Sequence, residues 1–124
     1  MWHYRNMKKV LITVLLTFLC FETKADYMQD LQISNDLLAF SEYGGKTKWS
    51  ISDLNYLENK VNQFSDQSLK QVWIANIITY SLIGDGISMQ PSTERCNIAK
   101  RNISKLNDKD LKSIWNTNYS LYGC

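Results

Sequence analysis

The second half of the chain carries two sets of aromatic and amide side chains with the same spacing. The two sets are Trp73, Asn76 and Tyr80, and then Trp115, Asn118 and Tyr122. On a helix, spacings of three and four residues place each set on one face. Such a face could line an aromatic groove whose central amide grips a protein partner or a small ligand. An aromatic stripe at helical spacing more often packs one helix against another, so we expect packing first and keep the groove as the functional alternative.

The carboxylates do not form a recognisable catalytic or metal-binding pattern. Asp66 and Asp108 each follow a Ser or Asn that we expect to cap a helix, where the helix dipole favours a negative charge. Asp85 lies between two glycines and could be a ligand or a base, although Gly-Asp-Gly is equally typical of a turn. The sequence contains no phosphate loop, nucleophile elbow or calcium loop. We therefore expect no catalytic residue, no metal and no cofactor.

Residues 1–25 follow the pattern of a secretory signal peptide. A basic beginning is followed by an apolar run over residues 10–21, and Ala25 is a small residue suited to precede a cleavage site. The apolar run is shorter than the ~20 residues that span a membrane, so an uncleaved anchor is the weaker alternative. We expect cleavage near Ala25 and a bacterial periplasmic or secreted protein, translated from Met1 or from Met7.

Removal of residues 1–25 changes which functions the composition permits. The whole chain carries a net charge of +2, but residues 26–124 contain 10 basic and 11 acidic side chains. The basic side chains are scattered, which argues against binding to nucleic acid or to a membrane surface. The only histidine is His3. The expected mature chain therefore lacks histidine for acid–base catalysis, for nucleophile pairs and for zinc sites.

An internal repeat with a period of 42 residues organises the expected mature chain. Residues 50–82 align without gaps on residues 92–124, with eight identical pairs that include the recurring tryptophan, asparagine and tyrosine. Each unit contains two apolar helical stripes joined by a short turn, which predicts an antiparallel hairpin. A further helix is expected over residues 26–43. Because two units are too few for an open solenoid, we expect an all-α fold in which these helices close into one small bundle.

The repeat also predicts a disulfide. Cys96 and Cys124 are the two cysteines of residues 26–124, an even number that suits an oxidising compartment. At an offset of 42 they align with Leu54 and Leu82. In an antiparallel hairpin these positions lie at the start of the first helix and the end of the second. We therefore expect a Cys96–Cys124 disulfide in place of a leucine contact.

The function predicted from these features is binding. We expect a non-enzymatic protein that binds a protein partner, as an inhibitor, an immunity protein or a secretion accessory does. A carrier of a small apolar or aromatic ligand is the first alternative, with a pocket between the hairpins near Trp73 and Trp115. A small carboxylate-based hydrolase of cell-wall sugars ranks last. No stable membrane anchor is expected after cleavage.

Overall fold

The computed structural model describes residues 24–85 and 90–124, and this part of the chain is helical, with no strand. Its elements are α2 (Lys24–Phe40), the 3-10 turn η1 (Glu42–Gly44), α3 (Ile51–Val61), α4 (Gln67–Ile83), α5 (Thr93–Ile103) and α6 (Lys109–Leu121). The predicted all-α class is therefore confirmed. The predicted signal peptide lies outside the described residues, except that Lys24 and Ala25 begin α2.

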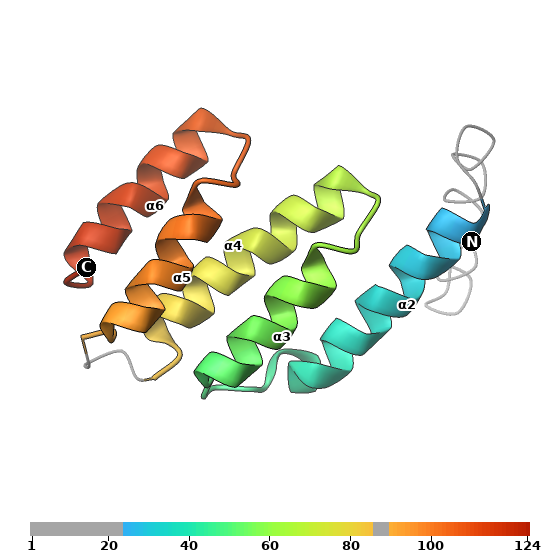
Figure 1. Cartoon of the computed structure of the whole chain (residues 1–124), viewed down its shortest axis with the longest axis horizontal. Coiled ribbons are helices and arrows are strands. Elements are labelled where there is room, and N and C mark those ends of the chain that lie inside the picture. Colours follow the sequence, from blue (N-terminus) through green and yellow to red (C-terminus); the bar gives the residue numbers. More distant parts are fainter. Residues whose placement is uncertain (1–23, 86–89) are drawn as a thin grey trace, which may run out of the picture.

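The helices form an open row in chain order. α4 contacts both α3 and α5, and α3 also contacts α5, while α2 contacts α3 and α6 contacts α5. The two end helices, α2 and α6, lie at opposite ends of the molecule (Figure 1). The sequence led us to expect a closed bundle. The row stays open because its end helices, α2 and α6, pack on α3 and α5 and not on each other (Figure 1).

Two serines fix the starts of the odd-numbered helices. The side chain of Ser50 accepts a hydrogen bond from the Asp53 backbone N–H at 3.1 Å, and the Asp53 carboxylate accepts one from the Ser50 N–H at 3.0 Å. This reciprocal capping box satisfies two backbone donors that would otherwise lack partners. Ser92 caps α5 by accepting from the Arg95 N–H at 3.2 Å.

Two aspartates cap α4 and α6. Asp66 and Asp108 accept hydrogen bonds from the backbone N–H groups three residues later, at 2.9 and 2.8 Å. The sequence suggested Ser65 and Asn107 as the caps, with the aspartates inside the first turn. That assignment is wrong by one residue, and the aspartates themselves are the N-caps.

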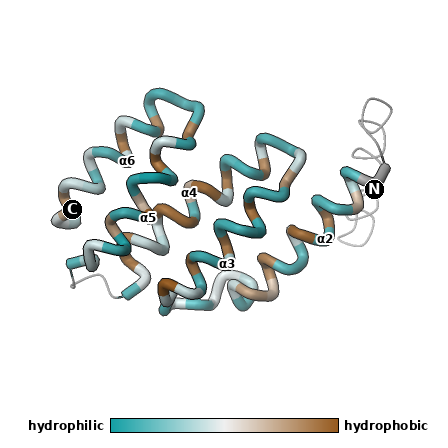
Figure 2. The backbone as a smooth tube through the Cα atoms, in the orientation of Figure 1, coloured by the Kyte–Doolittle hydropathy of each residue, from teal (hydrophilic) through white to brown (hydrophobic). Residues whose placement is uncertain are grey.

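The hydrophobic core is built by α2, α3, α4, α5 and their connections. Apolar and polar segments follow one another along the helices, as expected where part of each helix faces a core (Figure 2). α6 contributes no buried residue and packs on the core through partly exposed side chains. The buried members are Ile33, Leu37, Trp49, Leu54, Leu57, Val61, Phe64, Trp73, Ile74, Ile77, Ile78, Leu82, Ile98, Ala99, Ile103 and Leu106.

A buried carboxylate holds α2 against the turn between α3 and α4. Asp30 accepts hydrogen bonds from the backbone N–H and the hydroxyl of Ser65, at 2.9 and 2.8 Å. It also accepts from the Asp66 N–H at 3.0 Å. A buried carboxylate is stable only when its oxygens are satisfied, and three donors do so here.

The Cys96–Cys124 disulfide predicted from the sequence is formed. The Cα atoms of the two cysteines lie 5.6 Å apart. Cys96 lies in the first turns of α5 and Cys124 follows the end of α6, so the bond ties the far end of α6 to α5.

A polar network joins α3 to α5 through Glu58. Its carboxylate accepts hydrogen bonds from the Arg101 guanidinium and, at 2.8 Å, from the buried Asn102 amide. Partial burial raises the pKa of Glu58, but the hydrogen bonds from Arg101 and Asn102 outweigh this effect. The pKa of Glu58 therefore lies below its usual value of 4.5.

We predict that this network makes the fold acid-sensitive. A pKa that folding lowers stabilises the fold above the unfolded value, and this stabilisation is lost as the pH falls through the folded pKa. Glu58→Gln should lower the free energy of unfolding at pH 7 by about 1–2 kcal/mol. The loss should shrink as the pH falls below about 4.5. Urea titrations across pH would measure it, with exposed Glu42→Gln as the control; a constant loss at every pH would contradict the prediction.

Candidate functional site

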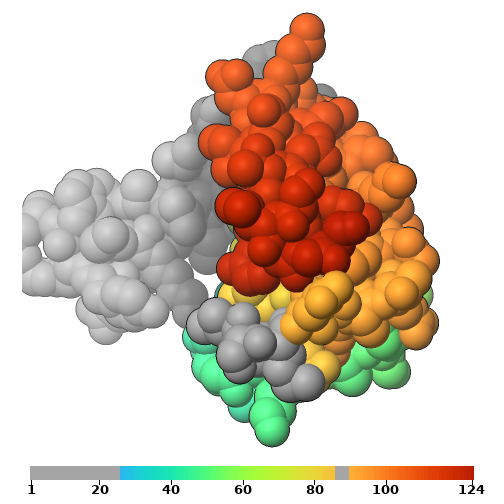
Figure 3. Space-filling view, turned by 90° about the vertical axis from the view of Figure 1, so that its left-hand side faces the viewer, coloured from blue at the N-terminus to red at the C-terminus, as the bar shows by residue number. Residues whose placement is uncertain are grey.

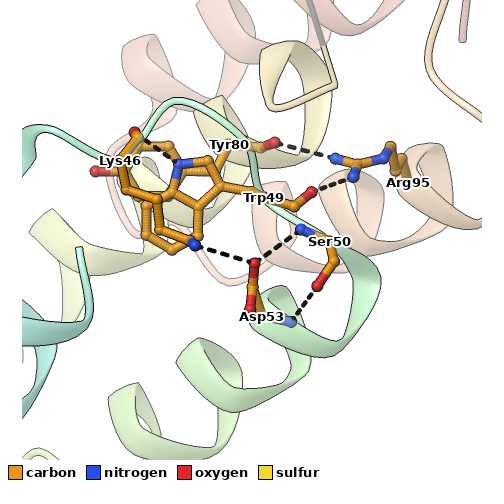
Figure 4. A network of polar contacts seen from close by, with 6 residues as sticks. All are labelled: Lys46, Trp49, Ser50, Asp53, Tyr80 and Arg95. Atoms are coloured by element: carbon orange, nitrogen blue, oxygen red, sulfur yellow. Dashed lines mark hydrogen bonds and ion pairs between the residues drawn. The ribbon is translucent and has the colours of Figure 1, made fainter. Parts of the chain in front are cut away.

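An aromatic stack lies where the linker before α3 meets the end of α4. Trp49 is only 2% exposed, and its ring stacks on Tyr80 with centroids 4.1 Å apart and planes 5° apart. The Trp49 backbone N–H donates to the Gly84 carbonyl at 2.9 Å, and its indole N–H donates to the Lys46 carbonyl at 3.2 Å. Main-chain and side-chain bonds thus hold the indole in one orientation (Figure 4).

A buried arginine fixes both partners of this stack. The guanidinium of Arg95 donates to the Tyr80 carbonyl at 3.4 Å and also to the Trp49 carbonyl (Figure 4). The Tyr80 carbonyl belongs to the last turn of α4, where a positive charge is favourable to the helix dipole. The planar fork of arginine suits two acceptors at once. Arg95 therefore positions the linker on α4 from its own place in α5.

Gly84 permits the close approach of the linker to α4. A Cβ atom at this position would lie 2.1 Å from the Tyr80 carbonyl oxygen and 2.9 Å from Cβ of Trp49. Both distances are shorter than non-bonded contacts allow, and the first atom belongs to the rigid backbone. Gly84 ends α4 with an ordinary negative φ, so its role here is to leave space.

Lys46 covers the outer side of the stack. Its ammonium lies 5.4 Å from the centre of the Trp49 ring and 3.4 Å from the Asp53 carboxylate. Burial raises the pKa of Asp53, but the backbone hydrogen bond from Ser50 and the charge of Lys46 bring it below its usual value. The ion pair and the cation–π contact together restrain the lysine.

Beside the stack lies a partly open pocket of about 430 Å³. Most of its surface is apolar, and its charged lining residues are two lysines and one aspartate. Burial raises the pKa of Tyr80, so its phenol stays neutral at physiological pH. The pocket could hold an aromatic or aliphatic group that carries a negative charge. Its lining residues are Lys46, Thr47, Lys48, Trp49, Tyr80, Ile83, Gly84 and Asp85.

Of the six predicted site residues, only Tyr80 lines this pocket. Trp73 is buried in the core, while Trp115 and Tyr122 are partly buried and pack against it. The two asparagines, Asn76 and Asn118, are partly buried. A second hollow, on the polar side of α6, contains none of the six; its lining residues are Lys109, Lys112, Ser113, Asn116, Thr117 and Ser120.

Sequence reasoning missed Trp49 and Arg95. Trp49 lay in a segment interpreted as a linker, and a helical period cannot detect a residue outside a helix. One local signal was present. Trp49 directly precedes the N-cap Ser50, and Leu54 lies four positions after Ser50, which is the spacing of a hydrophobic staple. Both of these apolar residues are buried in the same core cluster. Arg95 had no such signal, because its acceptors are backbone oxygens far away in the chain.

A second candidate surface consists of exposed apolar side chains on α2 and in the turn that follows it. Met28, Leu31 and Leu38 are 51%, 38% and 44% exposed, and Tyr43 is 81% exposed. Tyr43 and its neighbour Glu42 both have left-handed backbone angles, with φ of 55° and 54°. A non-glycine residue with left-handed backbone angles lowers the stability of the fold by roughly 1–2 kcal/mol. Backbone strain of this kind is often found at functional sites.

Comparison with known proteins adds no functional assignment. No protein-family model, curated protein or solved structure matches the chain. Among the described helices, none combines the length and the apolar character needed to cross a membrane. Residues 24–85 and 90–124 also contain no group of three or more His, Cys, Asp or Glu side chains that could hold a metal ion.

The two recurring tryptophans should respond differently to truncation. Trp73 is buried, so Trp73→Ala should lower the free energy of unfolding by about 3–5 kcal/mol. Trp115 is partly exposed on a helix without buried residues, so Trp115→Ala should lower the free energy of unfolding by clearly less than Trp73→Ala does. Urea unfolding of both variants would measure the difference. An equal loss would mean that α6 is packed as firmly as α4.

Proposed function

We propose that the chain is an exported, non-enzymatic helical protein that binds a protein partner in the periplasm or outside the cell. An inhibitor, an immunity protein or a secretion accessory would act in this way. The main support is the set of exposed apolar side chains on α2 and at Tyr43, because exposed apolar surface is typical of protein-binding sites.

The form of this surface favours a protein partner over a small molecule. Met28, Leu31 and Leu38 span most of one helix on its exposed side, which suits an extended contact rather than a cavity. Tyr43 then presents a large aromatic ring with few rotatable bonds, the type of residue that dominates binding energy at interfaces.

Export is supported by two features that belong to different parts of the chain. The leader pattern covers residues 1–25, and the Cys96–Cys124 bond lies near the other end. Structural disulfides persist mainly in oxidising compartments, so the bond favours the periplasm or the extracellular space.

The proposal includes an internal duplication of period 42. The starts of α3 and α5 are separated by 42 residues, and so are the starts of α4 and α6. The caps of corresponding helices match in residue type, as Ser50 with Ser92 and Asp66 with Asp108. In this proposal α2, which precedes both units, supplies the binding surface.

A photo-crosslinking amino acid at position 43 tests the partner proposal. Placed in the exported protein in bacterial cells, it should give a discrete crosslinked species that contains a second protein, because the Tyr43 ring is exposed. The same amino acid at Thr117, exposed on the polar side of α6, is the matched control. N-terminal sequencing of the recovered protein should give a start near Asp26.

Either of two results would contradict the proposal. The first is the absence of any crosslinked protein from position 43, and the second is an identical pattern from both positions. A recovered chain that still carries residues 1–25 in the membrane fraction would contradict the export proposal while leaving the partner proposal testable.

The alternative function is a carrier of a small apolar or aromatic ligand. The observation that favours it is the pocket beside Trp49 and Tyr80, with its apolar lining and its lysines. This site replaces the position between the hairpins that the sequence suggested near Trp73 and Trp115.

A fluorescent aromatic anion tests this alternative. Anilinonaphthalene sulfonate should quench the tryptophan emission of the oxidised protein, because the stacked Trp49 adjoins the pocket. Lys48→Ala should raise the Kd about fivefold, or ~1 kcal/mol. Lys112→Ala, which removes a lysine outside this pocket, should leave the Kd unchanged. Equal effects of the two variants would show that the probe does not bind at this pocket.

A further inference from the structure

Among the described α-helices, α6 is the one without a buried residue. Four partly buried side chains on one face attach it to the core: Leu111, Trp115, Tyr119 and Tyr122. The opposite face is polar, and α6 forms the outer surface at its end of the molecule (Figure 3). Along its length, α6 therefore packs on the rest of the fold through one apolar seam.

The two ends of α6 are held in different ways. At the start, the Gln71 side chain of α4 donates to the Lys105 carbonyl at 3.0 Å and accepts from the Asn107 N–H at 2.9 Å. At the far end, the Cys96–Cys124 disulfide provides the covalent attachment. The Gln90 amide adds one exposed hydrogen bond to the Gly123 carbonyl at 3.0 Å.

We infer that the Cys96–Cys124 disulfide is a redox-controlled attachment of α6 to α5. Reduction frees the far end of the helix, while Gln71 still holds the loop before it. α6 then pivots about residues 104–108 and separates from α5. The four seam side chains and the core surface beneath them become exposed together.

The chemistry requires a dithiol as the reductant. One thiolate attacks Sγ of Cys124, which belongs to an exposed residue, while Cys96 is 8% exposed. The S–S bond breaks, and Cys96 leaves as a thiolate that takes up a proton. The second thiol of the reductant then displaces Cys124 from the mixed disulfide. The protein gains two electrons and two protons, and the reductant leaves as its own disulfide.

Hydrogen exchange with and without dithiothreitol tests this inference on the mature chain. Amides of residues 109–121 should exchange at least tenfold faster after reduction, whereas those of residues 67–83 should keep their rates. An apolar fluorescent probe should bind the reduced protein more strongly. Unchanged exchange in α6, or an equal acceleration in α4 and α6, would overturn the inference.

A pair of variants separates helix release from any other effect of the reductant. In Cys124→Ser, the amides of α6 should exchange fast even without dithiothreitol, because the disulfide cannot form. Leu121→Ala removes an exposed side chain of the same helix and should leave exchange in the oxidised protein unchanged. Slow exchange of α6 in Cys124→Ser would overturn the inference, as would fast exchange in oxidised Leu121→Ala.

Discussion

The arrangement of the central helices depends on one buried guanidinium. Arg95 belongs to α5, yet its two hydrogen-bond acceptors are the carbonyls of Trp49 in the linker and Tyr80 in α4. A single side chain thus joins three parts of the fold that are distant in sequence. Arginine can do this because it is always charged and donates in several directions. Without it, two carbonyls would lose a charged donor, and the loss would be costly for the buried bond to the Trp49 carbonyl.

The sequence predicted the helices well because their signals are local. Capping serines and aspartates act within four residues, and apolar periodicity acts within one helix. The error of one residue at Asp66 and Asp108 arose because Ser65 and Asn107 are equally acceptable N-caps by type. Long-range polar contacts carry no such signal. Asp30 reaches Ser65 and Arg95 reaches Trp49 across more than thirty residues, and neither pairing leaves a pattern in the sequence.

The predicted site was less accurate because a helical stripe does not reveal how wide its buried arc is. Val72 and Trp73 are adjacent apolar residues of α4, yet Val72 is exposed and Trp73 is buried. α4 is contacted on one side by α3 and on another by α5, so its buried arc includes Ile74 and Ile78 as well. α6 has one neighbour of this kind, and the matching residue Trp115 is only partly covered.

The open row has a consequence for how the chain reaches its folded state. Most of its helix contacts join elements that follow each other in the chain, so forming them closes only short loops of backbone. Proteins dominated by such local contacts fold in microseconds to milliseconds. Disulfide formation takes seconds to hours, depending on the oxidant. The helices up to α5 should therefore pack first, and the oxidation that joins Cys96 to Cys124 should then secure α6 against helices that are already in place.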